Sequence, residues 1–132
     1  MRMWMVPPDV LCNQHLLGEH VELHMFKGTI AKGISIKGYI EKGLVDVEKI
    51  DKRHEELVLE MQMRGMHHQS PLRTDVSLFR AGWVDEEKSL TTLEDRCEDC
   101  RERIGRRRWP QKNAIGLKKI SEMLSMNRSG ND

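Results

Sequence analysis

Hydrophobic positions recur at helical spacing along much of the chain. The clearest run has members three and four residues apart, stops at Arg64-Gly65, and consists of Val47, Ile50, His54, Leu57, Val58 and Met61. A second run predicts a helix over residues 9–27, with Asp9 as its N-cap and Gly28 at its end. No pair of alternating segments with a hairpin turn accompanies these runs. The pattern therefore predicts an all-α fold.

Shorter helical segments occupy the rest of the chain. Residues 28–43 carry a glycine at every fifth position, which predicts a broken stretch with a short helix over 35–42. Beyond the second helix we expect a long connection over 66–90, helices over 92–104 and 115–126, and a frayed tail over 127–132. The length of 132 residues suits one domain. We therefore expect a compact single domain over residues 1–126, with three to five helices and long connecting loops.

One face of the first predicted helix carries charged groups where apolar side chains are usual. At 100° per residue, His15, Glu19 and Glu22 fall within an arc of about 60°, beside Leu16 and Leu23. Carboxylates on the apolar side of a helix must be paired, hydrogen-bonded or open to a cleft, because burying an unpaired charge is very costly. This face is therefore the first candidate for a functional site.

The N-terminal α-amine is a candidate nucleophile beside this face. An α-amino group has a reference pKa about 2.5 units below that of lysine, so more of it is the free base near neutral pH. The apolar residues that would pack the terminus against the body are Met3, Trp4, Met5 and Val6. Glu22 could then supply a carboxylate to a reacting sugar. The alternative is a terminus that is only tucked in, with acids that pair with surface cations.

Composition excludes several classes of protein. Hydrophobic residues make up 38% and charged residues 33% of the chain, and no apolar run approaches the roughly 20 residues that span a bilayer. The apolar stretch at the N-terminus is too short for the core of a signal peptide. Three cysteines cannot all pair with one another and are too few for a disulfide scaffold. We therefore expect a protein of a reducing compartment with no membrane partner.

The net charge of +1 conceals a basic segment. Residues 85–99 contain seven acidic side chains, whereas residues 101–119 contain eight basic side chains and one acidic one. The residues that could neutralise phosphates, with Trp109 stacking on a base, are Arg101, Arg103, Arg106, Arg107, Arg108, Lys112, Lys118 and Lys119. The alternative is a solvated helix end that pairs with the acidic segment before it.

Two pairs of residues have the spacing of metal ligands. His20 and His24 share one helix face and, with a carboxylate, could serve a metal-dependent hydrolase, although they lie on the polar side, where solvated histidines are common. Cys97 and Cys100 form half of a structural zinc site or a redox pair, but one CxxC without a partner pair is a weak signal. His54, inside an apolar stripe, is most simply a core histidine with satisfied hydrogen bonds. We therefore expect no metal, with Cys97 and Cys100 as the alternative ligands.

Several of these residues match the motif of a known family. An N-terminal residue followed by Arg2, Gln14-His15-Leu16, Glu19 and Glu22-Leu23 resembles the pyrimidine-dimer DNA glycosylase family, the endonuclease V type of ultraviolet repair enzyme found in phages, viruses and bacteria. On the second helix, Lys52-Arg53, Glu56-Leu57 and Arg64-Gly65 follow in the family's order. The likeness is specific over residues 1–27, fair over 49–66 and weak afterwards.

The resemblance implies a DNA glycosylase with associated abasic-site (AP) lyase activity and no cofactor. The α-amine of Met1 would attack C1′ of a damaged nucleotide, displace the base and form a Schiff base, and β-elimination would then nick the strand. Glu22 would stabilise the cationic sugar and assist proton transfer, while Arg2 and His15 would hold phosphate and support the site. Because Arg2 is too bulky for routine methionine removal, we expect Met1 to be retained.

The resemblance also implies a partner and further contacts. The partner is double-stranded DNA with damaged bases or abasic sites, bound by a monomer in the cytoplasm, at the nucleoid, or in the host cytoplasm if the protein is phage-encoded. Glu19 and Arg53 join the basic segment as expected DNA-binding residues. Val21 and Met25 replace helix arginines of the family, so the lesion stays open among a pyrimidine dimer, another damaged base and an abasic site. The alternative function is a non-catalytic DNA-binding or zinc-containing accessory protein that retains the fold.

Overall fold

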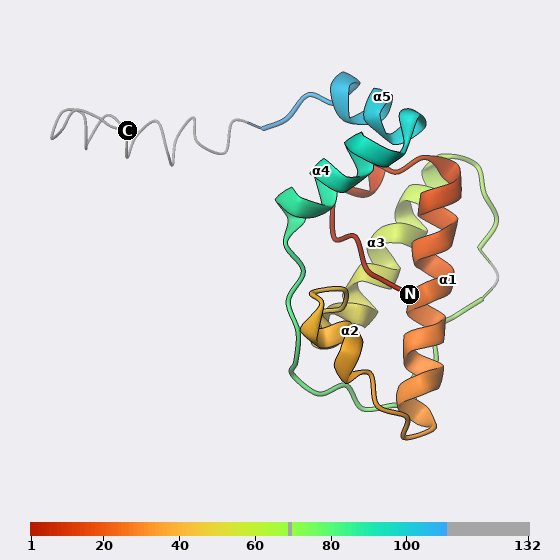
Figure 1. Ribbon diagram of the computed structural model, residues 1–132. Coiled ribbons are helices and arrows are strands. Elements are labelled where there is room, and N and C mark those ends of the chain that lie inside the picture. The colour runs from red at the N-terminus through yellow and green to blue at the C-terminus, as the bar shows by residue number, and fades with distance from the viewer. Residues whose placement is uncertain (69, 111–132) are drawn as a thin grey trace, which may run out of the picture.

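Helices are the only regular elements in the described part of the chain. The computed structural model describes residues 1–68 and 70–110 (Figure 1). The elements are η1 (Pro8–Val10), α1 (Asn13–Ala31), α2 (Lys37–Glu41), η2 (Val47–Lys49), α3 (Ile50–Met63), α4 (Glu86–Arg96) and α5 (Glu98–Arg106), where η denotes a 3-10 helix. The all-α prediction is therefore confirmed. The predictions for a helix over 115–126, a tail over 127–132 and a single domain reaching residue 126 fall at least partly outside the described residues.

The first long helix begins later than its sequence pattern predicts. Pro8 and Asp9 belong to the short helix η1, and the extended backbone of Leu11 (ψ 133°) separates η1 from α1. Cys12 is the N-cap of α1, because its sulfur accepts the backbone N–H of His15 at 3.4 Å. Asp9 is therefore not the cap, and the predicted start is wrong by four residues.

The same helix also continues beyond its predicted end. Gly28 lies inside α1, which runs to Ala31. Gly33 has φ 72°, a left-handed conformation that favours glycine, and its N–H bonds the carbonyl of Ile30. The chain therefore leaves α1 at the second glycine of this stretch and not at the first. The short helix expected over 35–42 is present as α2.

The later elements divide differently from the expectation. The amphipathic run spans two elements, because its first member, Val47, lies in η2 and the remainder forms α3, which ends beside Gly65 (φ 81°) as predicted. α4 begins within the predicted connection, because the Asp85 carboxylate caps it by accepting the Lys88 N–H at 3.2 Å. The single helix expected over 92–104 is two helices, since Cys97 adopts an extended backbone that ends α4 and caps α5.

The core lies between α1 and α3, and the two C-terminal helices cover one end of it. α1 packs on α3, α4 packs on α5, and η1 contacts both α3 and α5. Figure 1 shows α4 and α5 at the end of the molecule where α1 begins. The buried side chains include Met3, Val10, Leu11, Leu16, Leu23, Phe26, Ile50, Leu57, Leu93 and Ile104. No helix in residues 1–68 and 70–110 combines the length and apolar character that crossing a bilayer requires.

Candidate active site at the N-terminus

Buried side chains hold the N-terminal segment against the body of the protein. Met3 is fully buried, its N–H donates to the Leu44 carbonyl at 2.7 Å, and its sulfur accepts the N–H of Asp46 at 3.4 Å. Val6 is also buried. The segment runs along the helices and ends beside the middle of α1 (Figure 1). The terminus therefore has a fixed place next to the charged face of α1.

Glu22 contacts the first peptide of the chain. Its Oε1 accepts the backbone N–H of Arg2 at 2.7 Å, and its side chain is half-buried. That N–H belongs to the peptide that joins Met1 to Arg2, so the carboxylate lies one residue from the α-amine. The structure thus places the Glu22 carboxylate against the first peptide of the chain, next to the residue that carries the α-amine.

The side chain of Arg2 is held beside the same place. Its guanidinium lies 3.7 Å from the centroid of the Trp4 ring, and one of its nitrogens is 3.5 Å from the hydroxyl oxygen of Ser89. Burial lowers the pKa of Arg2 from its usual value, against the opposing effect of the Glu19 and Glu22 carboxylates. Arg2 is thus a half-buried cation next to the N-terminal amine.

Glu19 is paired inside the protein and does not reach the surface. Its two carboxylate oxygens accept hydrogen bonds from Nε and one terminal nitrogen of Arg53 at 2.8 and 2.9 Å, and both side chains are buried. Arg53 also bonds Glu56 at 3.2 Å. Burial opposes the charge of Arg53, but the two carboxylates hold its pKa above the usual value. This arrangement joins α1 to α3 and places neither Glu19 nor Arg53 where DNA could touch it.

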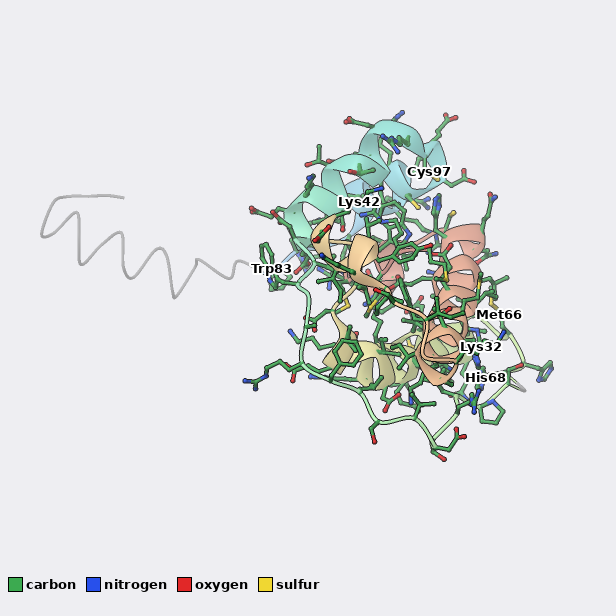
Figure 2. All side chains as sticks on the ribbon, turned by 60° about the horizontal axis from the view of Figure 1, so that its bottom comes forward. Lys32, Lys42, Met66, His68, Trp83 and Cys97 are labelled. Atoms are coloured by element: carbon green, nitrogen blue, oxygen red, sulfur yellow. The ribbon has the colours of Figure 1, made fainter. Side chains whose placement is uncertain are left out.

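A groove beside Arg2 went unnoticed in the sequence. It has a volume of about 420 Å³, and its lining includes Arg2, Lys42, Lys88 and Arg96 together with Glu41, Asp85 and the exposed ring of Trp83. Figure 2 shows Trp83 directed away from the body of the protein. These residues come from three separate segments of the chain, around residue 2, 41–44 and 83–96, so no local motif connects them. The only local signal was an exposed aromatic residue next to a glycine.

Gly82 fixes the position of Trp83. Its φ is 87°, and a Cβ atom at this position would overlap the carbonyl oxygen of Val45. The neighbouring carbonyl of Ala81 accepts the N–H of Val47 at 2.9 Å. The close approach of these two backbones, which only glycine permits, therefore sets one wall of the groove.

The basic segment is largely engaged with the protein itself. Arg107 bonds Asp9 at 2.9 Å, and its guanidinium lies 4.5 Å from the centre of the Trp109 ring. Arg103 donates to the carbonyl of Asp9, and Arg106 pairs with Glu102. Arg101 donates to the carbonyl of Glu94, whereas Arg108 is exposed. Lys112, Lys118 and Lys119 lie outside the described residues. The segment thus docks α5 on η1 with part of its charge and presents the remainder at the surface.

Cys97 and Cys100 were predicted as a ligand pair without a partner pair. In the structure they lie close to Cys12 and His15 at the start of α1. The four ligand atoms of Cys12, His15, Cys97 and Cys100 all lie within 4.8 Å of one another. Burial raises the pKa of Cys100 to about 12, whereas hydrogen bonds from the backbone and thiol of Cys100 outweigh burial at Cys97 and lower its pKa. Figure 2 shows Cys97 beside the helices of this end of the molecule. His15 was expected to support the site around Glu22, but its Nδ1 faces the Sγ atoms of Cys12 and Cys100.

His20 and His24 are likewise not the solvated pair that the helix pattern indicated. His20 is buried, His24 is half-buried, and both rings meet those of His54 and His68. Burial first, and then the neighbouring imidazoles, lower the pKa of His20 to about 4. His54 is in the core as expected, but its Nε2 has no hydrogen-bond partner. No carboxylate belongs to this group, so the proposed hydrolase site with a carboxylate is not formed among the described residues.

Comparison with known proteins supplies a family. Neither the curated proteins nor the solved structures with which the chain was compared include a significant match. The family model described as pyrimidine dimer DNA glycosylase matches residues 1–74, which is more than half of the chain. The matched part contains Met1, Arg2, His15, Glu22 and the Glu19–Arg53 pair. The chain therefore belongs to the pyrimidine dimer DNA glycosylase family.

Proposed function

We propose that the protein is a DNA repair glycosylase with AP lyase activity, in which the α-amine of Met1 is the nucleophile. The observation that carries this proposal is the 2.7 Å hydrogen bond from the Arg2 N–H to Glu22, which places a carboxylate one peptide from the amine. Membership of a DNA glycosylase family supports the substrate class, which is DNA with a damaged base or an abasic site.

The chemistry begins at C1′ of the damaged nucleotide. The amine lone pair forms a bond to C1′, the bond from C1′ to the base breaks, and the base leaves with that electron pair and a proton. Loss of protons from the amine and opening of the sugar ring then give a Schiff base. The Glu22 carboxylate stabilises the cationic sugar and exchanges these protons, a role supported by its hydrogen bond to the peptide that follows the amine.

Strand cleavage follows from the same intermediate. Removal of a proton from C2′ lets the electrons of that C–H bond form a double bond while the 3′ phosphate leaves, which is a β-elimination. Hydrolysis of the imine then releases the amine. Arg2 and the cations of the neighbouring groove offer positive charge to the phosphates on either side of the lesion.

Trp83 gives the groove a surface on which a displaced base can stack. An exposed aromatic ring beside cations is the arrangement that binds unpaired nucleotides, and a base must leave the stack before C1′ can be attacked. We propose that a monomer acts in this way, with the exposed cations of the basic segment as additional backbone contacts.

Covalent trapping tests the proposal. Protein that mass spectrometry shows to begin at Met1 is incubated with ultraviolet-irradiated or abasic duplex and borohydride, which reduces a Schiff base to a stable amine. We expect an adduct on Met1, its loss after acetylation of the α-amine, and a loss of at least about a hundredfold in Glu22→Gln. Glu94→Gln makes the same change at an exposed carboxylate of α4 and should trap as well as the unaltered protein.

Three outcomes would contradict the assignment. These are an adduct on a lysine, full trapping by Glu22→Gln, and a chain that starts at Arg2 yet retains activity. DNA binding without any trapping would instead support the non-catalytic accessory function.

A further inference from the structure

We propose that Cys12, His15, Cys97 and Cys100 bind one structural Zn²⁺ ion. The four ligands come from two helix starts with the same design. Cys12 caps α1 and Cys97 caps α5, and each is followed three residues later by the second ligand of its pair, His15 or Cys100. The spacing is therefore C-x2-H in one half and C-x2-C in the other, which is typical of structural zinc.

The distances between ligand atoms fit one tetrahedral ion. With Zn–S near 2.3 Å and Zn–N near 2.0–2.1 Å, the edges of the tetrahedron are about 3.8 Å between two sulfurs and about 3.6 Å between sulfur and nitrogen. The Sγ atoms of Cys12 and Cys97 are 3.9 Å apart. Nδ1 of His15 lies 3.2 Å from Sγ of Cys12 and 3.4 Å from Sγ of Cys100.

Each of the three cysteine sulfurs accepts a hydrogen bond from a backbone N–H group. Sγ of Cys100 accepts the N–H of Cys12 at 3.3 Å, Sγ of Cys12 accepts that of His15 at 3.4 Å, and Sγ of Cys97 accepts that of Cys100 at 3.4 Å. Such bonds orient the ligands and offset the negative charge that three thiolates bring.

A disulfide explains the group less well. The three cysteines are free, and one bond between two of them would leave the third sulfur and the imidazole without a role. The ion also has a structural consequence, because it ties α5 to the first turn of α1. The His15 ring lies edge-on to Trp4, with centroids 5.6 Å apart, so the ion would also steady the ring under Arg2.

Metal analysis of Cys97→Ser tests this site. Serine is itself a good N-cap, so α5 keeps its first hydrogen bond while the thiolate is lost. We expect Cys97→Ser to contain one equivalent of zinc less than the unaltered protein, with the same helical circular dichroism. Cobalt-loaded protein should have an intense thiolate-to-cobalt absorption band that this variant lacks. Unchanged zinc content in Cys97→Ser, or a cobalt complex without that band, would overturn the proposal.

A separate set of observations carries a second proposal: His20, His24, His54 and His68 bind another Zn²⁺ ion through their Nε2 atoms. α1 supplies the first two residues, α3 supplies His54, and the segment after α3 supplies His68. His68 and Cys97 lie well apart in the view of Figure 2. The two groups are therefore distinct.

The four Nε2 atoms share one unusual property. Each is buried and has no hydrogen-bond partner, and the ligand atoms of the group lie within 4.8 Å of one another. A buried polar atom without a partner destabilises the folded state, so four that converge on one point are unfavourable unless something binds them. A cation satisfies all four at once, because each unprotonated nitrogen presents a lone pair.

The ring positions also fit a single ion. Four imidazoles bound through nitrogen at about 2.0–2.1 Å around a tetrahedral ion have ring centroids roughly 5 Å apart. The His20 centroid lies 4.8 Å from those of His24 and His54 and 4.9 Å from that of His68. The His54 centroid lies 5.2 Å from that of His24 and 5.1 Å from that of His68.

Contacts of the other ring nitrogens orient two of the ligands. Nδ1 of His54 lies 3.1 Å from a carboxylate oxygen of Glu55, and His24 has a hydrogen bond with the backbone of Ser70. A metal-bound histidine usually donates its second N–H in this way, which leaves Nε2 free to coordinate.

The sequence offers a matched pair of variants for this site. His68→Ala removes a ligand, whereas His67→Ala removes an exposed histidine from the adjacent position. Neither lies in a helix. We expect His68→Ala to lose one equivalent of zinc and His67→Ala to lose none. Equal metal content in the two variants would overturn the proposal.

X-ray absorption separates the two ions from each other. In Cys97→Ser the remaining zinc should have nitrogen neighbours only, and in His68→Ala it should have three sulfurs and one nitrogen. Sulfur around the ion that remains in Cys97→Ser would contradict the histidine site, and its absence in His68→Ala would contradict the cysteine site.

Discussion

Gly82 meets a demand that no other residue can satisfy at its position. Its backbone is left-handed, and a Cβ atom would overlap the carbonyl of Val45. Gly82→Ala should therefore lower the free energy of unfolding by about 2–4 kcal/mol, through both the backbone penalty and the displacement of the neighbouring segment. Urea denaturation monitored by circular dichroism measures this loss.

Gly65→Ala provides the control for that substitution. Gly65 is also left-handed, but a Cβ atom there would meet open space. The loss should be only about 1–2 kcal/mol, which is the cost of the left-handed backbone. Equal losses at the two glycines would contradict the close contact with Val45.

The pairing of Glu19 with Arg53 makes a second prediction. Glu19→Ala leaves the buried guanidinium with only Glu56 and should lower the free energy of unfolding by about 3–5 kcal/mol. Glu41→Ala breaks an exposed pair with Lys37 and should change it by less than about 1 kcal/mol. Replacing both members, in Glu19→Leu with Arg53→Met, should recover much of the loss. No recovery would show that the pair does more than satisfy two buried charges.

For a single residue, the sequence can indicate that its position is unusual, but it does not indicate which residues it contacts. The position of Glu19 on an apolar face requires a partner, and that requirement is met. The partner lies 34 positions away on α3, and nothing in the spacing of either helix identifies it. For the same reason His20 and His24 looked solvated, because the residues that cover them come from other segments.

Among the helices, α2 is the least supported. Its five residues include none that is buried, whereas α1 and α3 contain six buried residues each. Backbone amides of α2 should therefore exchange hydrogen roughly a hundredfold faster than those in the middle of α1 and α3, by local opening. Exchange followed by mass spectrometry of peptides resolves these regions. Comparable protection of α2 and α3 would contradict the expectation.

The helices were predictable where periodicity is strong and less so where caps decide. α3 follows the hydrophobic pattern from Ile50 to its C-terminal end, and only the first member of the pattern, Val47, lies before it in η2. α1 and α5 have cysteines as N-caps, which are uncommon in that role. The sequence pattern therefore favoured Asp9 as the first cap and did not predict the break at Cys97. Both exceptions fall at residues that take part in the cysteine group, where the needs of a site override local preference.

The groove beside Arg2 is the surface on which we expect DNA to bind. Trp83→Ala should weaken binding to abasic duplex by about 1–3 kcal/mol, or roughly 5- to 150-fold, through loss of stacking. Phe79→Ala removes an exposed aromatic ring that does not line this groove and should have little effect. Fluorescence titration measures both affinities. Equal affinities for the two variants would remove Trp83 from the proposed binding surface.

The salt dependence of DNA affinity tests whether the cations of the same groove contact phosphates. Lys88→Gln should reduce the slope of log affinity against log salt by about 0.9 if Lys88 neutralises one phosphate, whereas Trp83→Ala should leave the slope unchanged. Titrations at several salt concentrations separate these effects. An unchanged slope in Lys88→Gln would place the DNA on another face.

The sequence identified the family because its motif lies in short segments near the N-terminus, and it identified the fold class because helical periodicity recurs along the chain. It did not identify the groove or the ligand groups, since each of these combines segments from distant parts of the chain. The matched family region ends at residue 74, so Cys97 and Cys100 complete their group from a part of the chain beyond it.

The two ligand groups are completed at different times during synthesis. Every member of the histidine group lies within the first 68 residues, whereas the cysteine group needs Cys12 and residues 97–100. A ribosome releases the chain from its N-terminus, and folding can begin before synthesis ends. Residues 1–68 can therefore gather the four imidazoles before α4 and α5 have left the ribosome, and the cysteine group forms last.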